Sequence, residues 1–348
     1  MNKFFLIILV TGIITVSSCK KEELLENRKA KWIENAFDAL KSNNYPRVKA
    51  ISWWHEDFES SLLKVNSSME SLAAYKKGVS SPIFLTTATM NSTKLIEPVS
   101  GIYHSAYPDF GGTEDVVTTE RINDFETLVN KNIVWAYFSN NWYDNIQFPS
   151  AEVDVISAAE RIPFIRIMPR TNFDGGGPDS NYTMQKIIDG EFDTDLIQWA
   201  IDASNTNIPL LVEFGTEVNG NWFPWNGQYN GAEETTGYGD VNLFDGAERF
   251  RDAYRHIIDI CNENGASNIT WFFHIDAYSQ PNVSWNEFEI YYPGDDYIDW
   301  LGVSVYGPQE SNRDYQEFSN IMDDVYPRLY SLSNKPIAIL EFAITEIE

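Results

Sequence analysis

Short apolar runs alternate along the chain with amphipathic stretches. Eight runs are typical of buried β-strands, at 48–54, 101–104, 133–138, 163–168, 209–217, 269–275, 300–306 and 336–341. Between most of them, apolar residues at three- and four-residue spacing predict helices at 122–131, 194–204, 247–264 and 319–331. Strands that alternate with helices predict a parallel sheet, and eight such units fit a (β/α)8 TIM barrel of the α/β class.

Two of these runs end in carboxylates that are placed alike. Glu217 ends the fifth run and Glu341 ends the eighth. Side chains two residues apart share a face of a strand, so Glu217 is expected on the face of Glu213. By the same spacing Glu341 is expected on the face of Ile337 and Ile339. Because catalytic groups of such barrels come from the carboxyl ends of strands, both glutamates are predicted to point into one mouth.

The two carboxyls suit glycoside hydrolysis. A retaining glycosidase needs two carboxyl groups about 5–5.5 Å apart, one protonated to assist the leaving group and one ionised to attack the anomeric carbon. Tyr306 ends the seventh run above the small residues Gly302 and Ser304, and a hydroxyl there would stabilise an ionised carboxylate. An inverting hydrolase, with carboxyls about 6.5–9.5 Å apart, is the alternative reaction.

Composition narrows the class of ligand. The chain has 348 residues, and its 51 acidic and 25 basic side chains give a net charge of −26, which argues against binding nucleic acid. Eleven Trp and eighteen Tyr suit sugar binding, because the apolar C–H faces of sugars pack on aromatic rings. The sequence has no His-Glu-x-x-His motif, clustered Cys and His or calcium loop, so neither a metal nor another cofactor is predicted.

The N-terminal segment is typical of an export signal. Residues 1–18 contain a lysine followed by an apolar stretch too short to span a bilayer. The stretch Val-Ser-Ser-Cys that ends at Cys19 resembles a bacterial lipobox, which predicts a lipid anchor on Cys19, a tether over 19–28 and one catalytic barrel over 29–348. The expected location is the bacterial cell envelope, with the membrane contacted only through this anchor. An ordinary signal peptide is the alternative.

A family resemblance lies in the turn after the fifth run. Residues 217–225, Glu-Val-Asn-Gly-Asn-Trp-Phe-Pro-Trp, look like the acid/base motif of glycoside hydrolase family 26. That family contains β-mannanases and relatives that act on mixed-linkage glucan and β-1,3-xylan. Residues 336–342 are similar to its nucleophile strand, 303–307 to the strand whose tyrosine supports the nucleophile, and 101–104 to its first strand.

The resemblance implies a role for each carboxyl and raises a question about substrate. It makes Glu217 the acid/base and Glu341 the nucleophile, with Tyr306 in support. Mannanases of the family usually have histidine before the acid/base glutamate, whereas this chain has Thr216. The identity of the backbone sugar is therefore less firmly implied than the reaction.

The order of the strands suggests a circular permutation. In such barrels the nucleophile strand is seventh and another helix and strand follow it. Here residues 31–40 read as a helix, and 48–56 resemble the family's eighth strand with its sugar-facing tryptophan. We therefore expect this strand between the first and seventh, with Trp54 rather than Trp53 facing inward. The alternative is an N-terminal cap on a truncated barrel.

Further polar and aromatic residues lie at or near strand ends, or in the turn after Glu217, and are candidates for binding substrate. They are Trp54, His104, Trp142, Asn219, Trp222, Trp225 and His274. Arg166 and Asp276 also lie near strand ends. For the buried charged and histidine positions, a structural pairing with a carboxylate is an equally good interpretation.

The sequence thus predicts a retaining endo-β-glycanase that is a monomer and acts on a plant or algal β-linked polysaccharide. β-Mannan is the first expected substrate, followed by mixed-linkage β-glucan or β-xylan. The alternative is a cell-surface lipoprotein with a barrel fold that binds glycan without cleaving it. The presence of both glutamates and Tyr306 favours the enzyme, because a binding protein has no need of a carboxylate pair.

Overall fold

The structure is a computed structural model that describes residues 27–58, 60–309 and 314–346. The predicted signal peptide and Cys19 lie outside the described residues, so the lipid anchor stays a prediction. Helix α1 begins at Arg28, the last residue of the predicted tether. The side chain of Asn27 caps this helix by accepting a hydrogen bond from the backbone of Ala30.

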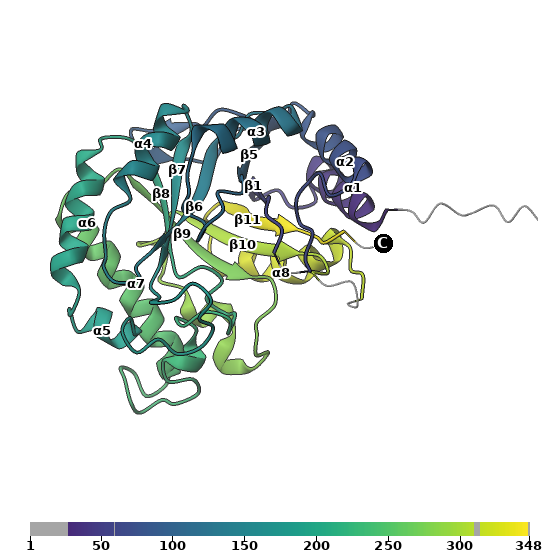
Figure 1. Cartoon of the computed structure of the whole chain (residues 1–348). Coiled ribbons are helices and arrows are strands. Elements are labelled where there is room, and N and C mark those ends of the chain that lie inside the picture. Colours follow the sequence, from purple (N-terminus) through teal and green to yellow (C-terminus); the bar gives the residue numbers. More distant parts are fainter. Residues whose placement is uncertain (1–26, 59, 310–313, 347–348) are drawn as a thin grey trace, which may run out of the picture.

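Eight parallel strands form the barrel seen at the centre of Figure 1. They are β1 (Val48–Trp54), β5 (Ile102–Tyr107), β6 (Trp135–Asn141), β7 (Ile162–Met168), β8 (Leu210–Phe214), β9 (Ile269–Asp276), β10 (Trp300–Tyr306) and β11 (Ile337–Ala343). Each pairs in parallel with its neighbours, and the pairing of β1 with β5 closes the sheet. The (β/α)8 barrel predicted from the sequence is therefore confirmed.

Helices surround this barrel (Figure 1). They are α1 (Arg28–Lys41), α2 (Met69–Val79), α3 (Thr119–Val129), α4 (Ser150–Ala158), α5 (Met184–Ile188), α6 (Asp193–Asn205), α7 (Asp245–Glu263) and α8 (Phe318–Leu332). Minor strands are β2 (Phe84–Leu85), β3 (Met90–Asn91) and β4 (Lys94–Leu95), and short 3₁₀ turns are η1 (Gly227–Tyr229), η2 (Ser284–Asn286) and η3 (Phe288–Tyr291). Within the described ranges, no helix is long and apolar enough to cross a bilayer.

Strand β1 lies between β5 and β11. Ala50 pairs with Tyr103 of β5, and Ile51 pairs with Ile339 of β11. The predicted position of this strand is therefore confirmed, and the alternative of a truncated barrel is wrong. The circular permutation itself concerns the order of strands in relatives and stays a prediction.

Alternation along β1 separates its two tryptophans. Trp54 stacks on Tyr107 with ring centroids 4.1 Å apart and faces the mouth of the barrel. Trp53 points the other way and packs edge-on against Trp32 of α1 at 6.5 Å and Phe342 at 4.9 Å. Parity predicted this division correctly, because neighbouring side chains of a strand lie on opposite faces.

Strand β11 departs from regular alternation just before its glutamate. Ala338 pairs with Gly302, but Glu341 pairs with Ser304, so the register shifts between them. Leu340 lies over Gly302, where a Cβ would come within 2.4 Å of it. Leu340 and Glu341 therefore both project inward across a β-bulge, a device that re-aims side chains beside active sites. The expectation that Glu341 shares a face with Ile337 and Ile339 was wrong, although its inward direction is as predicted.

Strand β8 ends three residues before Glu217, which was expected on the strand itself. The chain turns there through left-handed residues, with φ of +62° at Gly215 and +49° at Glu217. Only glycine suits the first position, because a Cβ on Gly215 would lie 2.7 Å from the Phe250 ring and 3.0 Å from Trp225. The turn, rather than strand parity, brings Glu217 to the mouth of the barrel.

Candidate active site

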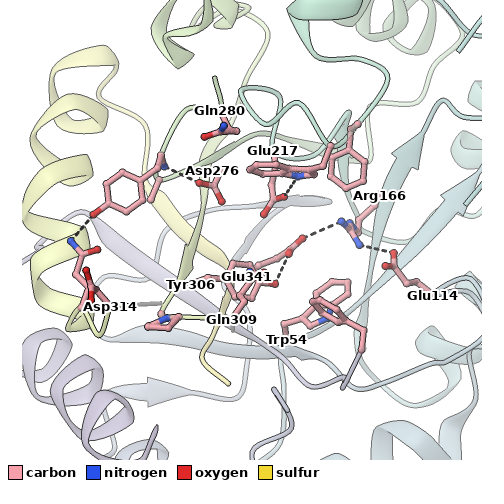
Figure 2. A pocket seen from close by; sticks show the side chains of 18 residues that line it. Trp54, Glu114, Arg166, Glu217, Asp276, Gln280, Tyr306, Gln309, Asp314 and Glu341 are labelled. Atoms are coloured by element: carbon pink, nitrogen blue, oxygen red, sulfur yellow. Dashed lines mark hydrogen bonds and ion pairs between the residues drawn. The ribbon is translucent and has the colours of Figure 1, made fainter. Parts of the chain in front are cut away.

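A cavity of about 530 Å³ opens at the carboxyl ends of the barrel strands. Figure 2 shows Glu217 and Glu341 facing each other across it, with Arg166, Trp54 and Asp276 around them. The loops after β1, β5, β8, β9 and β10 supply the rest of the lining. The cavity therefore lies where (β/α)8 barrels carry their active sites.

Glu341 has two stabilising neighbours. The Tyr306 hydroxyl donates a hydrogen bond to Oε2 across 2.7 Å. Nη2 of Arg166 lies 3.1 Å from Oε1. Burial raises the pKa of Glu341 to about 7, and the charge of Glu217 adds to this, while Arg166 and the Tyr306 hydrogen bond lower it. Both neighbours favour the ionised carboxylate that a nucleophile must present.

Glu217 has a different environment. Its Oε2 accepts a hydrogen bond from the Trp222 indole across 2.7 Å, and only 7% of the residue is exposed. Burial raises the pKa of Glu217, and the carboxyl of Asp276 raises it further. Such surroundings favour the protonated form, which is the form that a general acid needs.

The two carboxyls titrate as a coupled pair, because the charge of Glu217 raises the pKa of Glu341. Their contacts differ. A guanidinium and a phenol stabilise ionised Glu341, whereas Glu217 has hydrogen bonds with Trp222 and Ser304 and a neighbouring acidic group, Asp276. Glu341 is therefore the carboxyl with a cation beside it, and Glu217 is the carboxyl with an acidic neighbour.

Arg166 connects three carboxylates in the interior of the barrel. Besides Glu341, its Nη1 lies 2.7 Å from Glu114 and its Nε lies 3.5 Å from Glu213. The guanidinium also lies over the rings of Trp54 and Tyr137, with centroids at 4.9 and 5.0 Å. Because Arg166 is only 3% exposed and held on several sides, it presents a fixed positive charge to Glu341.

Below this layer, Glu213 and His274 form a buried ion pair. His274 Nδ1 lies 2.9 Å from Glu213, and its Nε2 lies 2.9 Å from the hydroxyl of Ser304. Burial alone would raise the pKa of Glu213, but His274, Arg166 and a hydrogen bond from Tyr137 hold it below its usual value. Burial likewise lowers the pKa of His274, but Glu213 raises it above its usual value. The pair anchors the layer that carries Arg166.

Seven of the candidate residues line this cavity together. They are Trp54, Arg166, Glu217, Trp222, Asp276, Tyr306 and Glu341. Trp222 is 39% exposed, in contrast to the nearly buried carboxyls, so its ring is open to a ligand. The structure thus brings together the two glutamates, the tyrosine and two tryptophans, which come from four separate segments of the chain.

Three other candidates support the site from behind the cavity instead of lining it. Trp225 is fully buried, stacks on Phe223 at 4.4 Å and donates its indole hydrogen to the carbonyl of Thr216. Asn219 is also fully buried, and its side chain bonds both the N–H and the carbonyl of Asp276. His274, described above, lies beneath the carboxyls. These contacts hold the turn and the interior in place.

Two candidates lie away from the cavity. His104 is buried between β5 and the helices, 3.0 Å from the Tyr75 hydroxyl and 3.0 Å from the carbonyl of Asn132. It was expected at a strand end, but β5 continues to Tyr107, and the parity of His104 turns it outward. Trp142 follows β6 directly and packs against Tyr182, with ring centroids 5.1 Å apart.

Other lining residues were not among the candidates. Glu114, Phe58 and Tyr278 belong to loops after strands and complete the wall of the cavity. The last two are 42% and 44% exposed, which suits aromatic surfaces for sugars. For Glu114, the available sequence signal was an acidic residue in the loop after the predicted strand at 101–104. Its partner Arg166 could not be inferred without the fold.

The described part of the chain contains no group of three or more His, Cys, Asp or Glu side chains that could hold a metal ion. Cys261 is a buried free thiol on α7. The cavity presents carboxyl groups, an arginine, a tyrosine and aromatic surfaces.

Part of the chain is similar to known glycoside hydrolases. Residues 179–331 match the family described as Glycosyl hydrolase family 26. Endoglucanase H of Acetivibrio thermocellus is 30% identical over 169 residues, which cover 48% of this chain and 17% of that protein. Mannan endo-1,4-beta-mannosidase A and B of Caldalkalibacillus mannanilyticus is 24% identical over 185 residues, or 52% of this chain and 30% of that protein.

Among solved structures, the catalytic domain of the Bacillus sp. JAMB-750 family 26 endo-beta-1,4-mannanase is similar with a TM-score of 0.46 and 14% identity. The similarity covers 91% of this chain and 72% of that one. The chain spans less than a third of the length of the two curated relatives, at 17% and 30%.

Proposed function

We propose that this chain is a retaining endo-β-glycanase of glycosyl hydrolase family 26, the family whose model matches residues 179–331. One observation carries the proposal: two buried carboxyls line one cavity in unlike surroundings, Glu341 beside Arg166 and Tyr306, and Glu217 beside Trp222 and Asp276. Two carboxyls with separated roles are what double displacement at a glycosidic bond requires.

The reaction proceeds in two steps. Ionised Glu341 attacks the anomeric carbon, while protonated Glu217 gives its proton to the leaving oxygen as the glycosidic bond breaks. A covalent glycosyl-enzyme ester on Glu341 remains. Glu217, now ionised, takes a proton from water as the water oxygen attacks the anomeric carbon, which releases the sugar and returns both carboxyls to their starting states.

The surrounding groups assist at defined atoms. Arg166 and the Tyr306 hydroxyl keep Glu341 ionised and oriented before attack, and both can stabilise it again when it leaves the ester. The buried position of Glu217 favours its proton before the first step. The exposed ring of Trp222 offers a surface to a sugar beside the scissile bond, whereas Trp54 lines the cavity with its ring covered by Tyr107 and Arg166.

The proposed substrate is a neutral β-linked polysaccharide. β-Mannan and β-glucan are the first two candidates, because the relatives above are named as a mannosidase and an endoglucanase. Thr216 occupies the position where mannanases of the family usually have histidine, and it lies 2.7 Å from His274. This difference favours β-glucan, and β-xylan is the third candidate.

The test is a reducing-sugar assay of the purified chain on β-mannan, mixed-linkage β-glucan and β-xylan. We expect release of oligosaccharides from one of them and little release from the others. NMR of the first-formed product then identifies its anomer. The β-anomer supports retention, whereas the α-anomer would assign an inverting reaction. Binding without release on every polysaccharide would favour the non-catalytic alternative.

We also propose that the protein is attached to the bacterial envelope through a lipid on Cys19 and acts as a monomer. The lipobox-like sequence that ends at Cys19 supports the anchor. The test compares radiolabelled palmitate incorporation and membrane fractionation for the parent chain and Cys19→Ser. Loss of label and release from the membrane are expected, and an unchanged membrane fraction would contradict the anchor. Light scattering of the soluble chain tests the monomer.

A further inference from the structure

A second cavity of about 360 Å³ lies beside the first, at the carboxyl end of β6. Its lining consists of Asp115 and most of the residues between 139 and 152, which end this strand, form the following loop and begin α4. We call it the outer cavity. Because it lies at the carboxyl end of a barrel strand, it is on the same end of the barrel as the catalytic carboxyls.

The outer cavity adjoins the catalytic cavity. Glu114 lines the catalytic cavity, and the next residue, Asp115, lines the outer one. Ser139 lines the outer cavity and donates a hydrogen bond to the carboxylate of Glu114. Figure 2 shows Glu114 at the opposite side of the catalytic cavity from Asp314. A chain of sugars that fills the catalytic cavity and passes Glu114 would therefore enter the outer cavity.

Two amides of the outer cavity are held in fixed positions. Asn140 accepts a hydrogen bond from the Trp199 indole at 3.1 Å and donates to the carbonyl of Gln147 at 3.1 Å. Asn141 accepts from Arg170 at 2.7 Å and donates to the carbonyl of Thr113 at 2.8 Å. Each amide retains one hydrogen and one lone pair for a ligand, because an amide offers two of each.

Two further amides have no protein partner in the part of the chain that the structure describes. They belong to Asn145 and Gln147, whose side chains are exposed at the edge of the outer cavity. Two aromatic rings also line the outer cavity: Tyr143, which is partly exposed, and Phe148, which is nearly buried and packs edge-on against Trp199 at 5.2 Å. Amides around an aromatic ring suit a sugar, whose hydroxyls need polar partners and whose C–H face is apolar.

The charge of the outer cavity limits the class of ligand. Asp115 and Glu152 are acidic, and none of the described residues that line the cavity is Lys, Arg or His. Anionic ligands such as uronic acid chains would be repelled, whereas carboxylates accept hydrogen bonds from neutral sugar hydroxyls.

We propose that the outer cavity is a subsite for a neutral sugar of the same chain that occupies the catalytic cavity. The inference rests on the proposed function and deepens it, because a subsite remote from the cleaved bond makes long chains better substrates than short ones. Asn145 and Gln147 are the specificity-determining residues, and their hydrogen bonds form only when the glycan extends past Glu114.

The test uses the double variant Asn145→Ala/Gln147→Ala and a matched control, Gln198→Ala/Asn262→Ala, whose amides are exposed on α6 and α7. kcat/KM is measured on oligosaccharides from disaccharide to hexasaccharide of the preferred series. We expect kcat/KM of the double variant to fall about tenfold on the longest substrate, because two neutral hydrogen bonds are lost. On the shortest substrate that is cleaved, kcat/KM should be unchanged. The control should match the parent chain at every length.

A binding experiment separates this inference from the proposed function. Calorimetric titration of the Glu341→Ala variant, with and without the Asn145→Ala/Gln147→Ala changes, uses cello-, manno- and xylo-oligosaccharides of the same lengths. A loss of affinity that is confined to longer chains supports the subsite. If the parent chain also hydrolyses no polysaccharide, that second result rejects only the proposed activity. An equal loss at every length, or no loss at any length, would overturn the subsite.

Discussion

The hydroxyl of Tyr306 donates a hydrogen bond to Glu341 across 2.7 Å and so stabilises its ionised form. We expect Tyr306→Phe to lower kcat by about a hundredfold to a thousandfold, the range for loss of one preorganised donor. Removing the bond raises the pKa of Glu341. Since the nucleophile must be ionised, the acidic limb of kcat/KM should move to higher pH. A pH–rate profile checks this, and an acidic limb that stays in place would contradict the role of Tyr306.

Trp222 allows the complementary experiment on Glu217. Its indole hydrogen bond stabilises the ionised form, so Trp222→Phe should raise the pKa of Glu217 further. The general acid must be protonated, and the basic limb of kcat/KM should therefore move to higher pH while the acidic limb stays. The same profile, measured beside Tyr306→Phe, separates the two roles. If the acidic limb moves in Trp222→Phe instead, Glu217 would be the nucleophile and Glu341 the general acid.

Removal of each carboxyl should produce a distinct chemical phenotype. Glu341→Ala is expected to lower kcat by at least about a thousandfold, because no glycosyl-enzyme can form. Added azide can occupy the space of the lost carboxylate and attack in its place, which gives an α-glycosyl azide from a β-glycoside. In Glu217→Ala, azide attacks the glycosyl-enzyme instead and gives the β-product. Mass spectrometry and NMR identify these products, and appreciable turnover of Glu341→Ala without azide would reject it as nucleophile.

The left-handed turn after β8 should be sensitive to a single methyl group. Gly215→Ala places a Cβ 2.7 Å from the Phe250 ring at φ +62°, and we expect the free energy of unfolding to fall by about 1–3 kcal/mol. Gly265→Ala is the matched control, since its φ is +83° and its nearest atom, on Ser204, lies at 3.5 Å. Denaturant unfolding measures both. Equal losses would show that the Phe250 contact contributes nothing.

The strands were predictable because their apolar runs are long and bounded by turns. Residues 48–54 and 300–306 were predicted with the bounds that β1 and β10 have. Three helices, α2, α4 and α5, were not predicted from the sequence. Of these α4 has few buried residues, Val153 and Ile156, and so gives a weak pattern of spacing. The periodic spacing of apolar residues reflects the buried face of a helix. A helix that buries few side chains therefore has a weak periodic pattern in the sequence.

The site was predictable only in part, for a geometric reason. Trp222 and Trp225 lie three residues apart in one turn, yet the first lines the cavity and the second is fully buried. No period applies in a turn that contains left-handed residues, so spacing could not tell them apart. The convergence of Glu114 and Glu341 on Arg166 depends on contacts between distant segments, which a single sequence does not record.

The pairing of β1 with β11 joins a strand that is synthesised early to one that is synthesised late. Strand β1 leaves the ribosome well before its partner, so its edge stays unpaired on that side until residues 337–343 emerge. Glu341 lies on that late strand. The proposed nucleophile therefore arrives with the strand that completes the barrel, and a nascent chain has no complete catalytic pair before it can close.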